Sequence, residues 1–282
     1  MPLFASGPDW LRVLRAQALQ PPLRPRVPLW AGAALIGSVE PHFLDKIRPD
    51  ASSGELRLLL KKEHSTISGV TPGWHLKGDV TAGLKLVARA LHEAGLAGAW
   101  RHEQLAVCDA QGQRLGSVER AAVRPLGIAT LAVHLVGQAP DGRFWVQQRA
   151  FDKPNDPGKW DTLVGGMVSS TDTVETALAR ETWEEAGLAL NQLQNLARGG
   201  VLTIRKPAQD GNGAGYVVEA IDWYTCTLPD GVVPFNQDGE VAQFRLMALA
   251  EVIAAIQRDE FTLEAALILA EVMGFLWPQV VL

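Results

Sequence analysis

The chain has 282 residues, of which 47% are hydrophobic and 20% charged, and its formal net charge is −5. This length accommodates one large domain or two ordinary ones, and the mild acidity argues against a nucleic-acid backbone as the main partner. The two cysteines, Cys108 and Cys226, are too few for a disulfide framework. No secretory signal or membrane span is recognised, so we expect a cytoplasmic protein that binds neither nucleic acid nor membranes.

Residues 1–122 are expected to form a smaller α+β domain at the N-terminus. Apolar residues recur with helical spacing over 10–19 and again over 83–94. Residues 29–39 indicate a pair of strands, and residues 105–118 indicate a β-hairpin.

Residues 123–282 are expected to form a second α+β domain, a mixed sheet with helices on both of its faces. Its first strand contains His134, which we interpret as a core histidine, and joins a second strand through the turn Asp141-Gly142. The elements predicted after that hairpin are strands at 160–164, 200–204, 216–227 and 241–246, and helices at 173–186, 248–258 and 262–275.

The predicted helix over 173–186 concentrates charge. An α-helix turns about 100° per residue, so Glu181, Glu184 and Glu185 share one face. Like charges at this spacing repel one another unless a positive group lies among them, and Arg180 neutralises only part of the charge. The remaining negative field suits a hard cation such as Mg²⁺, whereas a solvated surface helix is the alternative interpretation.

The segment that contains this helix resembles the Nudix box, G-x5-E-x7-R-E-U-x-E-E-x-G-U, in which U is a bulky aliphatic residue. The residues that match in register are Gly166, Arg180, Glu181, Glu184, Glu185, Gly187 and Leu188. Seven fixed positions in one frame make a specific motif.

Two positions of the box depart from the pattern. Asp172 stands where the family has Glu, and Thr182 stands where it has an aliphatic residue. In the family the first acid braces the box by pairing with the arginine, so Asp172 either reaches Arg180 or leaves that contact unmade. Asp172 would otherwise act as the N-cap of the helix. Thr182 weakens a packing contact without removing an expected metal ligand.

The resemblance continues outside the box. Residues 147–150, Lys153 and residues 157–161 are similar to one branch of the Nudix proteins, as is the later segment 238–244. With its N-terminal extension, the chain resembles the thiamine-pyrophosphokinase-related Nudix proteins, which carry an additional domain ahead of the Nudix domain. The N-terminal half is assigned to this branch by that extension and by its Gly-Ser-Val-Glu segments.

The resemblance implies the α/β/α sandwich of the Nudix fold and hydrolysis of a diphosphate linked to another moiety. The branch suggests thiamine diphosphate or its oxidised analogues, cleaved to the monophosphate. Glu181, Glu184 and Glu185 would hold Mg²⁺, or Mn²⁺ in its place, beside the phosphoryl oxygens. Either Glu185 or Glu184 is expected to act as the general base, with Glu240 as the alternative, and Arg180 to support the catalytic acids.

Further residues are expected to contact the small-molecule diphosphate. Arginine and lysine suit phosphate oxygens, glycine permits close approach of the backbone, and tryptophan stacks on rings. The residues expected in these roles are Arg149, Lys153, Gly165, Gly166 and Trp160, with Trp223 as a further candidate. Each also has an ordinary structural interpretation as a surface charge, a turn or a packed side chain.

Two other functions are compatible with a Nudix-like chain. Isopentenyl-diphosphate isomerase shares the Nudix architecture but needs a reactive cysteine after the first core strands, where this chain has none. Ligand-sensing Nudix modules commonly lose box acids, whereas this chain keeps them. The N-terminal domain is expected either to close over the substrate or to support a homodimer.

Overall fold

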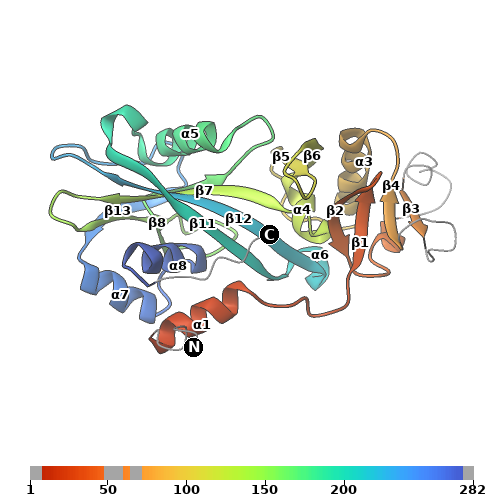
Figure 1. Ribbon diagram of the computed structural model, residues 1–282, viewed down its shortest axis with the longest axis horizontal. Coiled ribbons are helices and arrows are strands. Elements are labelled where there is room, and N and C mark those ends of the chain that lie inside the picture. The colour runs from red at the N-terminus through yellow and green to blue at the C-terminus, as the bar shows by residue number, and fades with distance from the viewer. Residues whose placement is uncertain (1–7, 48–59, 64–71, 276–282) are drawn as a thin grey trace.

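The computed structural model describes residues 8–47, 60–63 and 72–275 (Figure 1). The elements before residue 128 are α1 (Asp9–Ala18), β1 (Val27–Ala31), β2 (Ala34–Val39), the 3-10 helix η1 (Leu44–Ile47), β3 (Leu60–Glu63), β4 (Gly73–Leu76), α3 (Val80–Glu93), β5 (Gln104–Cys108), β6 (Arg114–Glu119) and α4 (Arg120–Leu126). The later elements are β7 (Thr130–Gln138), β8 (Phe144–Arg149), β9 (Trp160–Asp161), β10 (Val164–Met167), α5 (Val174–Ala186), the 3-10 helix η4 (Leu190–Gln192), β11 (Gln194–Ala208), α6 (Asp210–Gly213), β12 (Gly215–Thr227), β13 (Val241–Met247), α7 (Leu249–Gln257) and α8 (Leu263–Val272).

The larger sheet belongs to the C-terminal part. Its strands run in the order β11-β12-β7-β8-β13, and β10 pairs with β7 while β9 pairs with β8. The pair β12–β7 is parallel, and the other pairs in this sheet are antiparallel. The sheet is therefore mixed, as the sequence predicted.

Helices cover both faces of this sheet (Figure 1). Alternate side chains of a strand point to opposite faces, and β7 shows the consequence. Ala132 and Val136 join the core cluster that α1, α7 and α8 cover, whereas Val133 and Leu135 join the cluster beneath α5. The predicted α+β sandwich is confirmed, and α5 packs against β7 and β10.

The N-terminal part has a core of its own. Its four-stranded sheet has the order β2-β1-β4-β3, and β5 and β6 form a separate hairpin. Trp74 of β4 and Leu84 of α3 are fully buried in this core, together with Leu105 of β5. Both Gly-Ser-Val-Glu segments lie at the end of the second strand of a hairpin, at β2 and at β6.

Helix α1 packs away from that N-terminal core. Its Leu11 and Leu14 belong to the cluster of the larger sheet, and Trp10 meets Phe275 edge to face at 5.6 Å between ring centroids. Gln20 N donates to Arg205 O over 2.7 Å, which fastens the following segment to β11. The division at residue 122 stays a prediction, but α1 lies with the part beyond it.

The start of α5 differs from the prediction. Thr173, not Asp172, is the N-cap: its Oγ1 accepts from Thr176 N over 3.2 Å, and Thr176 Oγ1 accepts from Thr173 N over 2.8 Å. Gly187 ends the helix at φ 64°, the left-handed conformation that glycine tolerates best. Because Thr173 fills the cap, Asp172 is free for another contact.

The strand predicted over 160–164 divides into β9 and β10, with Thr162 between them. None of the helices in the described ranges has both the length and the apolar character needed to cross a bilayer.

Candidate active site

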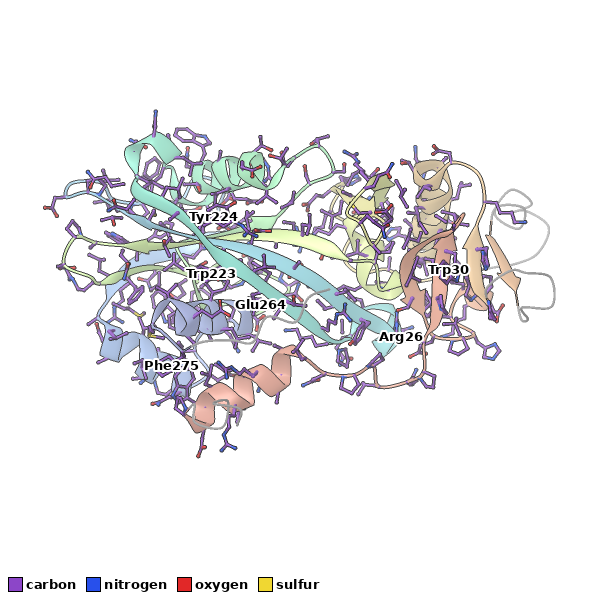
Figure 2. All side chains as sticks on the ribbon, viewed as in Figure 1. Arg26, Trp30, Trp223, Tyr224, Glu264 and Phe275 are labelled. Carbon is purple, nitrogen blue, oxygen red and sulfur yellow. The ribbon has the colours of Figure 1, made fainter. Side chains whose placement is uncertain are left out.

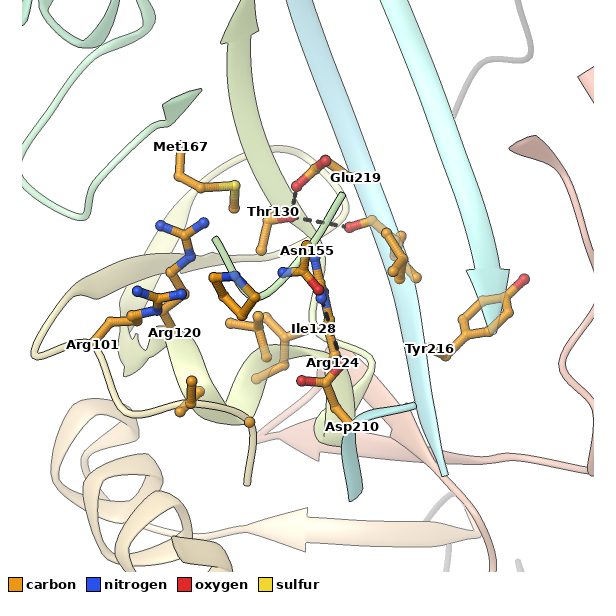
Figure 3. A pocket seen from close by; sticks show the side chains of 17 residues that line it. Arg101, Arg120, Arg124, Ile128, Thr130, Asn155, Met167, Asp210, Tyr216 and Glu219 are labelled. Atoms are coloured by element: carbon orange, nitrogen blue, oxygen red, sulfur yellow. Dashed lines mark hydrogen bonds and ion pairs between the residues drawn. The ribbon is translucent and has the colours of Figure 1, made fainter. Parts of the chain in front are cut away.

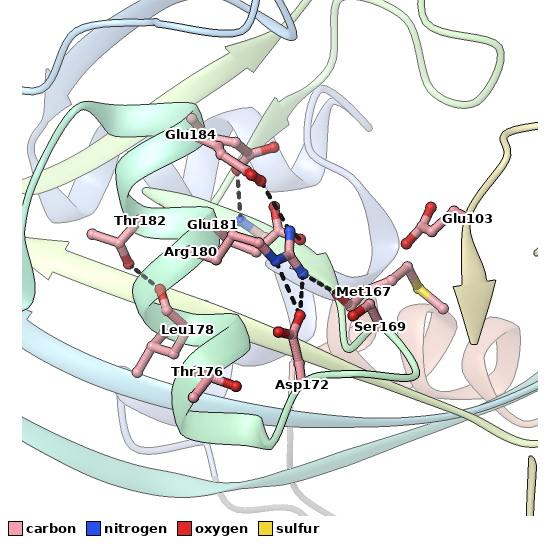
Figure 4. A network of polar contacts seen from close by, with 12 residues as sticks. Glu103, Met167, Ser169, Asp172, Thr176, Leu178, Arg180, Glu181, Thr182 and Glu184 are labelled. Carbon is pink, nitrogen blue, oxygen red and sulfur yellow. Dashed lines mark hydrogen bonds and ion pairs between the residues drawn. The ribbon is translucent and has the colours of Figure 1, made fainter. Parts of the chain in front are cut away.

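Arg180 organises the acidic face of α5 (Figure 4). It donates to Asp172 Oδ2 from Nε over 3.0 Å and from Nη2 over 2.8 Å, and Nη2 also donates to Met167 O over 3.1 Å. Its Nη1 donates to Glu181 Oε1 over 2.8 Å and to Glu184 Oε2 over 2.9 Å. The shorter acid at position 172 therefore reaches the arginine and braces it.

Glu185 is held by two donors from the neighbouring strands. Its Oε2 accepts from Gln147 Nε2 and from Gly165 N, each over 2.9 Å. The residue is only 2% exposed, and burial raises the pKa of Glu185 to about 8 despite these hydrogen bonds. The two hydrogen bonds fix the orientation of the carboxylate, but they do not offset the cost of burying its negative charge.

Glu181 lies against the backbone of β10. A Cβ atom at Gly166 would stand 2.0 Å from Glu181 Cδ, so only glycine leaves room for this carboxylate. Burial raises the pKa of Glu181 to about 7, although the charge and hydrogen bond of Arg180 oppose it. At Gly165 a Cβ would stand 2.8 Å from the His134 ring, so the two glycines make room for side chains on opposite faces of β10.

These carboxylates line a cavity of about 500 Å³, which we call the main cavity. The residues predicted from the sequence that line it are Arg149, Lys153, Gly165, Gly166, Arg180, Glu181, Glu184, Glu185 and Glu240. Its volume lies within the ordinary range for small-molecule sites. The fold thus brings together nine of the ten residues predicted for the site.

The two expected phosphate-binding cations have protein partners here. Arg149 donates to Asn155 O from Nη2 over 3.1 Å and lies 3.4 Å from Asp161 Oδ2 through Nη1. Lys153 Nζ forms an ion pair with Glu240. Burial acts to raise the pKa of Glu240, but Lys153 outweighs it and holds that pKa below its usual value.

Trp160 is the predicted site residue that lies elsewhere. Its indole packs against the core cluster beneath α8, and it does not line the main cavity. Trp223, the further stacking candidate, is buried in the same cluster (Figure 2). His134 is buried as predicted, with Nδ1 2.8 Å from Thr162 Oγ1, but it also lines the main cavity.

The donor set fits a divalent cation of the Mg²⁺ type. Among the described residues, no group of three acidic, histidine or cysteine side chains is placed to hold one ion directly. Glu181 and Glu184 are instead hydrogen-bonded to Arg180. Mg²⁺ usually takes one or two carboxylates and completes its shell with water and substrate phosphate. The buried Gln147 Oε1, which has no hydrogen-bond partner among the described residues, adds an unsatisfied oxygen beside Glu185.

Several residues at the main cavity were not expected from the sequence. Gln147 supports Glu185 from β8, and Glu103, Arg120 and Arg124 enter from the segment before residue 128. No spacing in the sequence relates these residues to the box, because they come from other elements: Gln147 from β8, and both Arg120 and Arg124 from α4.

The similarity of the chain to known proteins agrees with this geometry. Residues 128–271, just over half of the chain, match the NUDIX domain family. Over 148 residues the chain is 32% identical to Nudix hydrolase 24, chloroplastic, of Arabidopsis thaliana, covering 51% of this chain and 40% of that protein. Over 215 residues it is 26% identical to the uncharacterized protein YJR142W of Saccharomyces cerevisiae, covering 68% of this chain and 62% of that one.

An isopentenyl-diphosphate Delta-isomerase of Kocuria rhizophila is also similar, 28% identical over 159 residues, which are 55% of this chain and 83% of that enzyme. The chain spans less than two thirds of the length of the first two relatives. The matched family, the box residues on α5 and the mixed sheet lead to one conclusion: the chain belongs to the Nudix family.

Proposed function

We propose that the protein is a divalent-metal-dependent pyrophosphohydrolase that cleaves a diphosphate linked to another moiety. The observation that carries this proposal is the convergence of Glu181, Glu184 and Glu185 on the main cavity, which Arg149 and Lys153 also line. Carboxylates that hold a cation and cations that hold phosphate oxygens are the two halves of a phosphoryl-transfer site.

Arg149 and Lys153 bind the diphosphate. Arg149 has a long contact to Asp161 and presents a planar fork that suits two phosphate oxygens. Lys153 supplies a point charge and exchanges Glu240 for a phosphate oxygen when substrate binds. That exchange releases the Glu240 carboxylate beside the phosphate.

A divalent cation, Mg²⁺ or Mn²⁺, would supply positive charge to offset that of the phosphoryl oxygens and would make a nearby water more acidic. Glu185, fixed by two donors, and Glu181, which lies against Gly166, are the residues that would hold this cation. Glu184 and the released Glu240 are the more exposed acids, with side chains 43% and 51% exposed. One of these two accepts the proton of the water.

For the substrate we propose thiamine diphosphate or its oxidised analogues, which would yield the monophosphate. The resemblance to the thiamine-pyrophosphokinase-related branch supports this choice. Glu219 and Glu264 also line the main cavity, and Lys206 Nζ lies 3.3 Å from one oxygen of Glu264. Carboxylates there suit a cationic ring.

The test is phosphate release from a panel of diphosphates that includes thiamine diphosphate and its oxidised forms, with and without Mg²⁺. We expect hydrolysis only in the presence of the metal. The general base is identified by comparing two variants, Glu184→Gln and Glu240→Gln, since loss of the base lowers kcat more. If the protein cleaves no diphosphate in the panel with Mg²⁺ or with Mn²⁺, the proposal is contradicted.

Isomerisation of isopentenyl diphosphate is not proposed. Cys226 is buried in the core beneath α5, where burial raises its pKa to about 12, and Cys108 lies in β5. Neither cysteine lines the main cavity.

A homodimer stays a prediction, which light scattering of the purified protein tests.

A further inference from the structure

A smaller hollow of about 130 Å³ adjoins the main cavity, and we call it the side pocket (Figure 3). The two hollows share Arg120, Arg124 and Met167 among their lining residues, so they lie next to each other. Arg101 lines the side pocket as well, and Figure 3 shows it beside Arg120. All three arginines precede residue 128, where the match to the Nudix family begins.

The three arginines differ in how they are held. Arg120 Nη1 lies 2.7 Å from Glu103 Oε2, a close ion pair, whereas Arg124 Nη1 lies 3.5 Å from Asp210 Oδ2. The backbone N of Arg101 donates to Glu119 Oε1 over 3.0 Å. Its guanidinium has no side-chain partner among the described residues.

The side pocket lies close to the catalytic acids. Glu103, the partner of Arg120, lines the main cavity together with Glu181. Besides Lys153, the charges of Arg120 and Arg101 help to lower the pKa of Glu240 against its burial. The loop that precedes α5 is also fastened to β5, since Ser170 N donates to Gln104 O over 2.7 Å.

We propose that Arg101 and Arg120, contributed by the chain ahead of the Nudix domain, bind an oxyanion of the diphosphate substrate. The N-terminal half then completes the substrate site instead of standing apart from it. This inference rests on the proposed function and assigns part of substrate recognition to residues that a minimal Nudix domain does not contain.

The chemistry of the pocket supports a phosphate group. A guanidinium presents parallel N–H donors that match phosphate oxygens, and Arg120 exchanges Glu103 for such an oxygen. The volume of the side pocket equals that of a few water molecules at about 30 Å³ each, which is room for one phosphate. The alternative role, fastening α4 to the residue just before β5, accounts for the pair Arg120–Glu103 but does not involve Arg101, which is exposed.

The test measures binding of inorganic phosphate to the full-length protein by titration calorimetry in the presence of a chelator, so that no metal takes part. We expect Arg101→Gln to weaken phosphate binding about tenfold or more, because it removes charge-assisted hydrogen bonds without breaking an ion pair in the described residues. Arg120→Gln should weaken binding similarly. Arg89→Gln, an exposed change on α3 away from both hollows, should leave phosphate affinity unchanged.

The same variants are then assayed on the diphosphate panel. Arg101→Gln is expected to raise KM about tenfold with little change in kcat. If Arg101→Gln binds phosphate and substrate as the wild type does, this inference is wrong even though hydrolysis proceeds. If the wild type binds phosphate through Arg101 but hydrolyses no diphosphate, the proposed function fails instead.

Discussion

Asp172 and Arg180 are joined by two hydrogen bonds to the same carboxylate oxygen, from Nε over 3.0 Å and from Nη2 over 2.8 Å. The pair fixes the guanidinium, whose third nitrogen is then left to contact Glu181 and Glu184. One residue outside the helix thus sets the positions of two acids on it.

Removing this brace should impair catalysis more than folding. Asp172→Ala is expected to lower kcat/KM about ten- to hundredfold, because Arg180 loses its anchor and the acids lose their alignment. Asp172→Glu, which restores the residue typical of the family, should keep most of the activity. Asp141→Ala removes another acid paired with a nearby arginine, Arg143, in the turn between β7 and β8, and serves as the control. Equal activity of Asp172→Ala and wild type would contradict the brace.

The buried acids predict a pH dependence of stability in the metal-free protein. Burial raises the pKa of Glu185 to about 8 and that of Glu181 to about 7, from an ordinary value of 4.5. The folded chain therefore binds these protons more tightly than the unfolded chain, and stability declines as the pH rises from 4.5 through 7 to 8.

The measurement is the melting temperature in a chelator across this pH range. We expect the wild type to lose several degrees more than Glu185→Gln, whose amide does not ionise. Added Mg²⁺ at the alkaline end should restore the wild type and have less effect on the variant. Glu260→Gln, at an exposed acid, should behave as the wild type. Parallel curves for wild type and Glu185→Gln would show that Glu185 is not the group responsible.

Gly166 should tolerate no side chain. In Gly166→Ala the new Cβ would lie 2.0 Å from Glu181 Cδ, so the carboxylate must leave its place. We expect kcat to fall about a hundredfold, with weaker binding of the metal measured by calorimetry. Gly142→Ala, in the hairpin turn at φ 84°, is the contrasting variant: it should cost about 1 kcal/mol of stability while kcat per folded molecule is kept. A fully active Gly166→Ala would mean that Glu181 does not act from the position seen here.

Gln147, in β8, should orient the carboxylate of Glu185 for metal binding. Gln147→Leu keeps the volume but removes the amide that donates to Glu185 over 2.9 Å. We expect metal affinity to fall about tenfold, as for other residues that orient a metal ligand. Gln148→Leu, at the next position, removes a donor to Gly158 O instead and should leave metal affinity near that of the wild type. If both variants bind metal equally well, the contact to Glu185 has no part in metal binding.

The sequence by itself determined the elements whose patterns are local. The spacing of Glu181, Glu184 and Glu185 places them on one helix face, and Gly187 ends that helix, because both effects depend only on neighbouring residues. The same holds for the alternation along β7, which assigns its residues to the two faces of the sheet. Even the N-cap was misplaced by only one residue, since threonine and aspartate make the same kind of cap.

The tertiary structure decided which residues from different elements meet. Gln147 reaches Glu185, Lys153 pairs with Glu240, and Trp160 turns into the core, although nothing in their spacing distinguishes these outcomes. Arg120 likewise enters the main cavity from the other half of the chain. The physical reason is that periodicity fixes directions within one element, whereas distances between elements follow from how whole layers pack.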